Sequence, residues 1–395
     1  MTESHVPPPT ADLAALGRRS LVVGALFTLI SLVGLATNPA QFYRSYLVAF
    51  ADVLGVALGS LAILMLHHLS GGAWGLVIRR ILEASSRTIS FVALFAVPLF
   101  FGLKHLYPWA DPARVAGDEI LRHRAIYMNP TGVAIRLAVA LLLWTVFAQA
   151  LSRMSKKQDE APDAGLERKM QLVAAPGLAL YCLLVTVVAI DLLMSLDPHW
   201  FSAIYGVYVV GGQALAGLAF TLLACLFLAR RGPMADVLQP RHVHDLGKLL
   251  LAFTMLWAYF ALSQFLIIWS GNLPEEIGFF KDRLTGGWGI VSLALALFHF
   301  ALPFVFLLSR NFKRDLGRLV WVAILLLFMR WLDLYWLVAP AFHPGKLSPH
   351  WLDLTTPVAL FGIWLWAFTR QLAVRQLLPV NDSGLAAALE VHAHD

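Results

Sequence analysis

Arg330 and Asp333 stand three positions apart in an apolar stretch of the sequence, a spacing that puts both side chains on one face of a helix. Asp52 stands in another apolar stretch without a charged residue one turn away, so its partner must come from another helix. Ionisable side chains in apolar surroundings are costly, and they usually serve function or pair with one another. These residues could therefore bind and release protons, or they could fix the packing of helices.

Further polar residues stand near the ends of apolar stretches. We expect the candidates for a proton path to line the polar interior of the helix bundle, and they are Asp52, Asp191, Asp197, His199, Tyr259, Gln264, Arg330 and Asp333. Asp197 precedes Pro198, which favours a turn, so Asp191, Asp197 and His199 could instead cap a re-entrant turn. Lys104, His105 and Arg136 are candidates for contacts at the membrane interface or with a quinone, unless these side chains only reach out to the interface.

The composition shows that the elements positioning these residues are membrane helices. Of 395 residues, 59% are hydrophobic and only 14% are charged, whereas a soluble domain carries about 25% charge. Cys182 and Cys225 stand alone in apolar runs, which excludes a disulfide framework, a CxxC zinc site and a protein-ligated iron–sulfur cluster. In such a protein the net charge of +6 indicates lysines and arginines collected on one side of a membrane, not a nucleic-acid partner.

Ten stretches are long and apolar enough to cross a bilayer, which takes about 20 residues. They are 20–37, 45–67, 88–106, 131–151, 171–193, 202–229, 247–270, 286–308, 317–339 and 352–373. The connections between them, among which 69–87, 107–130 and 152–170 are long, are still too short for a domain. The first stretch could be a signal peptide, but Asn38-Pro39 follows it where a small-residue cleavage site would stand, so an uncleaved helix is favoured.

The distribution of lysine and arginine predicts the orientation. Of the 30, the side that carries both termini has 20 and the other side has 8, and Arg136 and Arg330 lie within spans. The positive-inside rule then places both termini in the cytoplasm of a multi-pass protein of a bacterial inner membrane. Most polar candidates then fall in the outer half, and His67, His68 and His299 are the only titratable candidates in a dry cytoplasmic half.

Asp52 and Asp333 are expected to differ in their affinity for protons. Apolar surroundings favour the protonated form of a carboxylic acid, so we expect Asp52 to exchange protons near neutral pH. Asp333 is expected to stay ionised beside Arg330 and to act mainly through its charge. A haem between helices would need two facing histidines, and His299 has no evident partner at its depth.

The second and sixth spans align at an offset of 157 residues. Ser45, Gly55, Ala57, Leu58, Leu61 and Ala62 match Ser202, Gly212, Ala214, Leu215, Leu218 and Ala219. We infer two parallel four-helix bundles: 1–42 holds a tail and the first helix, 43–195 bundle I, 196–340 bundle II, and 341–395 the last helix and a tail. Gly55-xxx-Gly59 and Gly212-xxx-Ala216 would let neighbouring backbones approach closely, although small residues are common in any membrane helix.

Four stretches are distinctive: Met194–Tyr208 (MSLDPHWFSAIYGVY), Leu251–Gln264 (LAFTMLWAYFALSQ), Gly271–Glu276 (GNLPEE) and Trp331–Pro340 (WLDLYWLVAP). Together they resemble the second large membrane subunit of alternative complex III, a quinol:cytochrome c oxidoreductase. That subunit belongs to the polysulfide-reductase membrane-subunit (NrfD-like) family. The resemblance covers roughly residues 20–375 and is strongest over 190–340.

The resemblance implies a function and partners. It implies a ten-helix protein in two four-helix bundles, with menaquinol or ubiquinol oxidised on the periplasmic side of the complex and no cofactor bound covalently or through metal ligands in this chain. Its expected partners are a homologous membrane subunit, a periplasmic iron–sulfur subunit, c-type cytochrome subunits, lipids and, as a further candidate, a terminal oxidase, with no nucleic acid. The subunit would then be a structural and proton-conducting partner.

Two other functions compete with this one. A secondary transporter would need unwound helices and a polar site at the midplane, and a passive anchor for a periplasmic redox module would make the buried charges dispensable. The connection 107–130, with Asp118, Glu119, Arg122 and Arg124, is the candidate periplasmic contact unless it is only a solvated loop.

Overall fold

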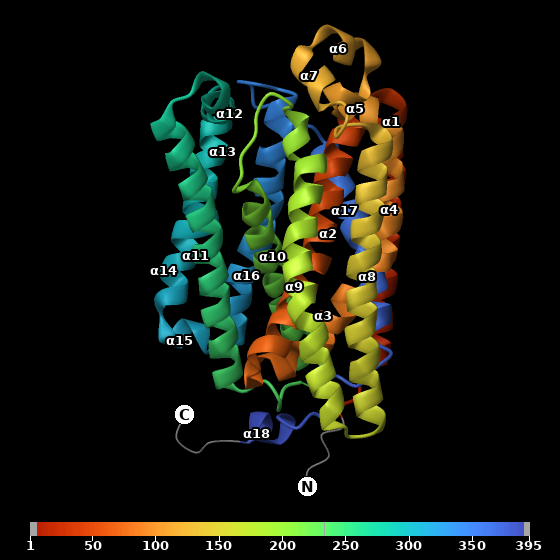
Figure 1. Cartoon of the computed structure of the whole chain (residues 1–395). Coiled ribbons are helices and arrows are strands. Elements are labelled where there is room, and N and C mark those ends of the chain that lie inside the picture. Colours follow the sequence, from red (N-terminus) through yellow and green to blue (C-terminus); the bar gives the residue numbers. More distant parts are fainter. Residues whose placement is uncertain (1–5, 233, 391–395) are drawn as a thin grey trace.

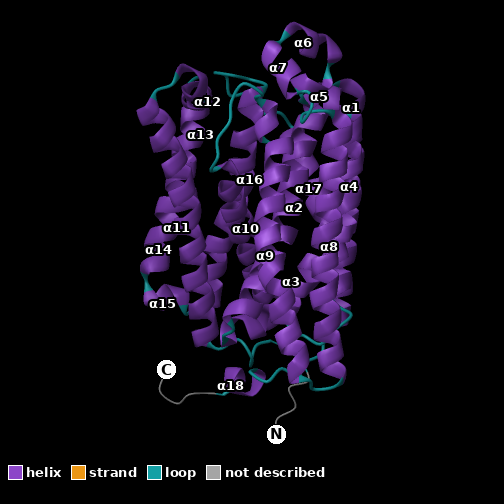
Figure 2. Ribbon diagram, viewed as in Figure 1, coloured by secondary structure: helices purple, strands orange, loops and turns teal. Residues whose placement is uncertain are grey.

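The computed structural model describes residues 6–232 and 234–390, and the regular elements in this part of the chain are all helical (Figures 1 and 2). Within it, ten helices are long and apolar enough to cross a membrane. They are α1 (Thr10–Thr37), α2 (Pro39–Ser70), α3 with α4 (Ala73–Arg87 and Ile89–Phe101), α8 (Pro130–Glu160), α9 (Ala164–Leu192), α10 (Tyr205–Ala229), α11 (Pro240–Gly271), α13 with α14 (Trp288–Ala294 and Leu302–Leu308, joined by the π-helical turn η3, Leu295–Ala301), α16 (Leu316–Val338) and α17 (Leu352–Leu372). The predicted all-α membrane protein with ten spans is confirmed.

Short elements close the two ends of this bundle. One end, called the cap end here, carries α5 (Leu103–Leu106), η1 (Pro108–Ala110), α6 (Pro112–Gly117), α7 (Glu119–Arg124) and α12 (Pro274–Leu284) (Figure 1). The other, called the basic end, carries α15 (Arg310–Lys313), α18 (Leu385–Leu389) and the start of α1. The turns η2 (Met194–Leu196) and η4 (Ala339–Ala341) follow α9 and α16.

Two central helices hold the bundle together. α2 and α10 pack on each other and are buried along most of their length. Around α2 lie α4 and α9, with α8 against both; around α10 lie α11 and α16, with α14 against α11. α1 packs along α17, which in turn contacts α2 and α3. The internal repeat stays a prediction.

Glycines bring the two central helices together, as the sequence predicted for this region. A Cβ atom added at Gly59 would lie 1.8 Å from the carbonyl oxygen of Gln213. On α10, a Cβ atom at Gly217 would lie 2.6 Å from the carbonyl carbon of Gly59. Only residues without a side chain allow the helices to cross at this distance.

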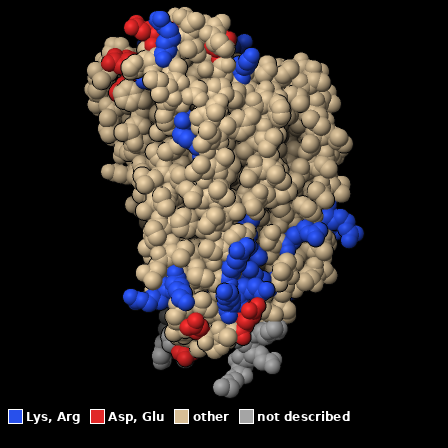
Figure 3. Space-filling view, turned by 45° about the vertical axis from the view of Figure 1, so that its right-hand side comes forward, with Lys and Arg blue, Asp and Glu red and all other residues tan. Residues whose placement is uncertain are grey.

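The surface fits a membrane environment. On the face in Figure 3, the charged side chains gather toward the two ends of the molecule and leave a middle zone without them. Large apolar side chains lie exposed along the outward helices, for example Val22 and Leu29 on α1, at 63% and 64%. Lipid tails or other membrane subunits would cover such surfaces.

Two segments that were predicted to be loops are helical. Residues 73–87 form α3, whose middle and end are buried, and residues 152–170 continue α8 and α9 with only a short connection between them. Their charged residues lower the mean hydropathy, but many of those charges form ion pairs inside the protein, so the helices persist.

Candidate functional site

Arg330 and Asp333 of α16 form a buried ion pair among the helices that surround α10. Arg330 Nη1 donates to the Asp333 carboxylate, and the two side chains are 2% and 0% exposed. The same carboxylate accepts hydrogen bonds from the Tyr208 hydroxyl on α10 and from Trp257 Nε1 on α11, the latter at 3.2 Å. The predicted shared face of α16 is confirmed, and Asp333 is held by donors from three helices.

A glycine makes room for the arginine. A Cβ atom added at Gly212 of α10 would lie 2.2 Å from Arg330 Nη1 and 2.3 Å from Cζ. Any larger residue at Gly212 would displace the guanidinium group. The glycine matched to Gly55 by the proposed repeat therefore also shapes the site.

His299 extends this buried centre through Trp257. It lies in the π-helical turn η3, is 0% exposed, and its ring centroid is 3.9 Å from that of Trp257. Among the described residues, neither nitrogen of His299 nor Oε1 of the buried Gln264 has a hydrogen-bond partner. Buried polar atoms of this kind are usually paired, so they mark places where water can bind. A π-helical turn is also frequent at functional sites.

Arg330 also acts electrostatically on Asp52 of α2, and it lines a small cavity. The Asp52 side chain is partly exposed and forms no hydrogen bond or ion pair with the described residues. That Asp52 takes a charged partner from another helix therefore stays a prediction. The cavity of about 30 Å³ is lined by Arg330, Gln213 and apolar residues such as Leu54 and Trp144, enough for a water molecule, and Asp52 is not among its lining residues.

Arg136 and Asp191 form a second buried pair near the cap end. Arg136 Nε and Nη2 donate to the two carboxylate oxygens of Asp191 at 2.7 and 3.0 Å. The Tyr127 ring lies 3.9 Å from the guanidinium carbon. Asp191 is 2% exposed, so this pair joins α8 to α9 and leaves neither charge free.

Asp197 and His199 lie in a surface turn, which corrects the prediction that they line the bundle interior. The Asp197 carboxylate accepts from the backbone N–H of His199, as in a turn that precedes a proline. The exposed His199 lies 2.8 Å from the Asp118 carboxylate of the cap. Hydrogen bonds from the backbone N–H of Leu121, together with His199, lower the pKa of Asp118. The turn-capping alternative describes these two residues.

Tyr259 also departs from its predicted place. It is 64% exposed on the outward face of α11, whereas Gln264 is 5% exposed and faces the bundle. Lys104 and His105 are exposed at the cap end of α4 and α5, where the His105 ring stacks on Tyr43. Their place agrees with an interfacial role and brings them into no cluster with the other candidates.

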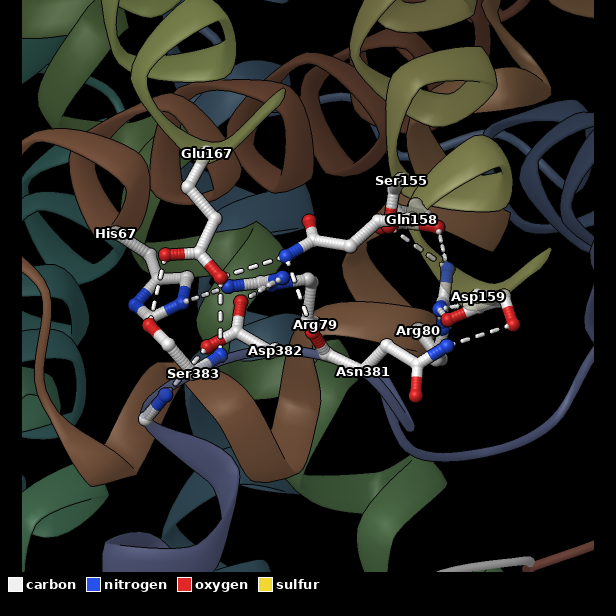
Figure 4. A network of polar contacts seen from close by, with 12 residues as sticks. His67, Arg79, Arg80, Ser155, Gln158, Asp159, Glu167, Asn381, Asp382 and Ser383 are labelled. Atoms are coloured by element: carbon white, nitrogen blue, oxygen red, sulfur yellow. Dashed lines mark hydrogen bonds and ion pairs between the residues drawn. The ribbon is translucent and has the colours of Figure 1, made fainter. Parts of the chain in front are cut away.

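The basic end holds a polar network that the sequence did not predict (Figure 4). Arg79 Nη1 of α3 lies 2.7 Å from the Asp382 carboxylate, and its Nη2 lies 3.2 Å from His67 Nε2. Arg80 binds Glu83 at 2.8 Å and Asp159 of α8 at 2.5 Å. This half of the protein is not dry, because α3 brings its charged side chains inside.

The C-terminal segment closes this network. Ser383 donates to the Glu167 carboxylate through its hydroxyl at 2.7 Å and its backbone N–H at 2.9 Å. Gln158 donates to the same carboxylate at 2.6 Å. Arg375 adds a contact of 3.3 Å to Glu83. Among the described residues, Glu83 Oε1, His67 Nδ1 and His68 Nε2 have no partner, so the network has places for water.

No family model matches the chain, and no curated protein matches it. The chemistry of the site must therefore be argued from its side chains. In the described part of the chain, no three His, Cys, Asp or Glu side chains gather in a way that could hold a metal ion. The buried centre brings the Asp333 carboxylate and the Tyr208 phenol to Arg330, which lines a water-sized cavity, and the His299 imidazole lies against Trp257. Groups of these kinds can bind, hold and pass protons.

Proposed function

We propose that this chain is an integral membrane subunit of a respiratory quinol-oxidising complex, without a redox centre of its own. It would support quinol oxidation on the side of the cap end and would take part in moving protons. The observation that carries the proposal is the fully buried Arg330–Asp333 pair, whose arginine lines a water-sized cavity and acts electrostatically on Asp52. That the complex oxidises quinol is inferred from the resemblance of the four sequence motifs to a membrane subunit of alternative complex III.

The two aspartates would have different roles. Asp333 accepts three hydrogen bonds and pairs with Arg330, so it stays ionised and fixes the charge of the centre. The same arginine acts electrostatically on Asp52, which forms no hydrogen bond or ion pair with the described residues. An incoming proton would therefore bind Asp52, and its release would restore the attraction between Asp52 and Arg330.

The partners would be a homologous membrane subunit, a periplasmic iron–sulfur subunit and c-type cytochromes, with the basic end in the cytoplasm. The cap is a natural contact for a periplasmic partner, since it is exposed and carries charged residues of both signs, such as Glu119 and Arg122. Ile126, beside α7, is 93% exposed. An apolar side chain so exposed outside the membrane spans favours a protein contact.

The test uses the native complex in proteoliposomes with Asp52→Asn and Asp333→Asn. We expect quinol-driven proton movement to fall by tenfold or more in Asp52→Asn, because an amide cannot carry the proton. The matched control is Asp245→Asn, whose carboxylate is exposed and pairs with Lys248 at the basic end. Unchanged quinol oxidation and proton movement in both variants would instead identify a passive anchor.

A preliminary observation separates the classes of function. After mild extraction, iron–sulfur and haem c absorbance should co-purify with this chain. A lone, colourless chain would contradict a redox complex and favour a transporter.

A further inference from the structure

Basic side chains crowd together where α14 ends, α15 crosses the basic end and α11 begins. His244 and Lys248 belong to α11, and Arg310 and Lys313 belong to α15 (Figure 1). Lys248, Lys313 and Arg310 all act electrostatically on His244, and Lys248 acts on Lys313, so the four groups are close neighbours. The acid within this group is Asp245, which pairs with Lys248 at 3.0 Å.

Lys313 is the unusual member of this cluster. It is 7% exposed, yet it forms no hydrogen bond or ion pair with the described residues. Its alkyl chain lies against α11, where a Cβ atom added at Gly247 would be 2.8 Å from Lys313 Cγ. Burial and the neighbouring Lys248 lower the pKa of Lys313. Its Nζ atom itself reaches the surface close to Lys248, and a bound anion would offset the repulsion between these two charges.

The surroundings point to the source of that anion. The cluster lies between two helices that are long and apolar enough to span a membrane, one ending at Leu308 and the next beginning at Leu316. A bilayer around these helices would therefore place its headgroups near the cluster. Directly before it, Val305 and Leu308 of α14 are 63% and 57% exposed and form an apolar wall. A soluble anion would gain nothing from such a wall, whereas an acyl chain would cover it.

We propose that His244, Lys248, Arg310 and Lys313 bind the phosphate of an anionic phospholipid whose acyl chains lie along α14. Lys313 supplies a charge whose alkyl chain is held against α11, and Arg310 and Lys248 supply the exposed charges beside it. The site is independent of the buried centre and of the proposed redox function, because it lies at the basic end and uses none of the same residues.

Titration of the delipidated full-length protein in detergent tests the proposal, with binding measured by native mass spectrometry. The probes are phosphatidylglycerol, phosphatidylcholine and inorganic phosphate. We expect phosphatidylglycerol to bind at least tenfold more tightly than phosphatidylcholine, with the preference declining as salt is added. Each of Lys313→Gln and Arg310→Gln should weaken its binding about fivefold, since each basic residue near a membrane surface adds about that factor.

The controls keep the test decisive. Lys313→Arg should retain the preference because it retains the charge. Arg310 is exposed, so Arg310→Gln can lose lipid without loss of the fold. Lys281→Gln, at an exposed position of the cap end, should change nothing. Equal binding of the two lipids, or an unchanged preference in Lys313→Gln and Arg310→Gln, would overturn the proposal. Equal occupancy by inorganic phosphate alone would overturn the lipid assignment.

Discussion

Replacing one or both members of the Arg330–Asp333 pair measures how much of the buried centre is electrostatic. Asp333→Leu removes the counter-charge of Arg330 and leaves the donors of Tyr208 and Trp257 without their acceptor. Breaking a buried pair by removing one partner costs about 3–5 kcal/mol. Hydrogen bonds between membrane helices contribute only about 0.6 kcal/mol each, so the orphaned charge should dominate the loss.

The double variant Arg330→Met/Asp333→Leu therefore gives the sharper prediction. It still lacks the hydrogen bonds that Tyr208 and Trp257 donate to Asp333, but it no longer buries a charge without its partner. We expect it to regain at least about 2 kcal/mol relative to Asp333→Leu, an interaction energy within the range for contacting residues. The assay is the free energy of unfolding of the full chain in mixed micelles, compared across the wild type, the single variants and the double variant.

Asp52 supplies an internal check on the same reasoning. Because Arg330 also acts electrostatically on Asp52, Asp52 should partly compensate for the loss of Asp333. Adding Asp52→Asn to Asp333→Asn should then cost more than the sum of the two separate changes. If Asp333→Leu and the double variant were equally unstable, and Asp52→Asn were simply additive, the electrostatic account of the centre would be refuted.

Two further predictions concern the packing of the helices, and both can be read from thermal stability in detergent. Gly59→Ala should cost about 1–3 kcal/mol, because its Cβ atom would meet the backbone of Gln213, whereas Gly278→Ala, with open space around it, should be neutral or slightly stabilising. Arg80→Met should cost about 3–5 kcal/mol because it removes the main partner of the buried Glu83, which keeps only the longer contact to Arg375, and of the partly exposed Asp159. The exposed Lys156→Met should change stability by under about 0.5 kcal/mol. Equal effects in either pair of variants would contradict the packing described.

The features that the sequence predicted are those encoded locally. A transmembrane helix is a continuous apolar stretch, so hydropathy alone finds the ten spans. Arg330 and Asp333 are three residues apart on one helix, so helical geometry alone puts them together. Gly59 marks a close helix crossing for the same reason, although its partner residue on α10 could not be named.

The features that were missed depend on residues far apart in the chain. The charged residues of α3 led to the prediction of a loop, because the carboxylates that pair with them are distant in the sequence. Asp159, which pairs with Arg80, and Asp382, which pairs with Arg79, are about 80 and 300 positions away. In the sequence, Tyr208 and Trp257 look like the aromatic residues that commonly flank membrane spans, and only the tertiary structure brings them to Asp333. They were missed as candidates because the sequence carries no information on this contact.

Tyr259 is a different kind of error, because helix geometry could have prevented it. Trp257 and Gln264 are seven residues apart and share one face of α11, since 3.6 residues make a turn. Tyr259 is two residues beyond Trp257 and therefore points to nearly the opposite side. Its exposure of 64% follows directly from that angle.

The two buried polar regions leave a defined barrier between them. Gln213, which accepts from the Tyr181 hydroxyl at 2.8 Å, lies against Gly59 at the edge of the central cavity. From Gly59 to His67, α2 runs eight residues, or about 12 Å. Ser60 in this segment donates to the carbonyl of Val56 on its own helix, so its hydroxyl cannot donate to a bridging water without giving up that bond. A proton cannot cross about 12 Å of packed apolar residues in one transfer. If this chain moves protons from one polar region to the other, as proposed, water must enter the segment of α2 between Gly59 and His67, where the glycine crossing with α10 leaves little room for it.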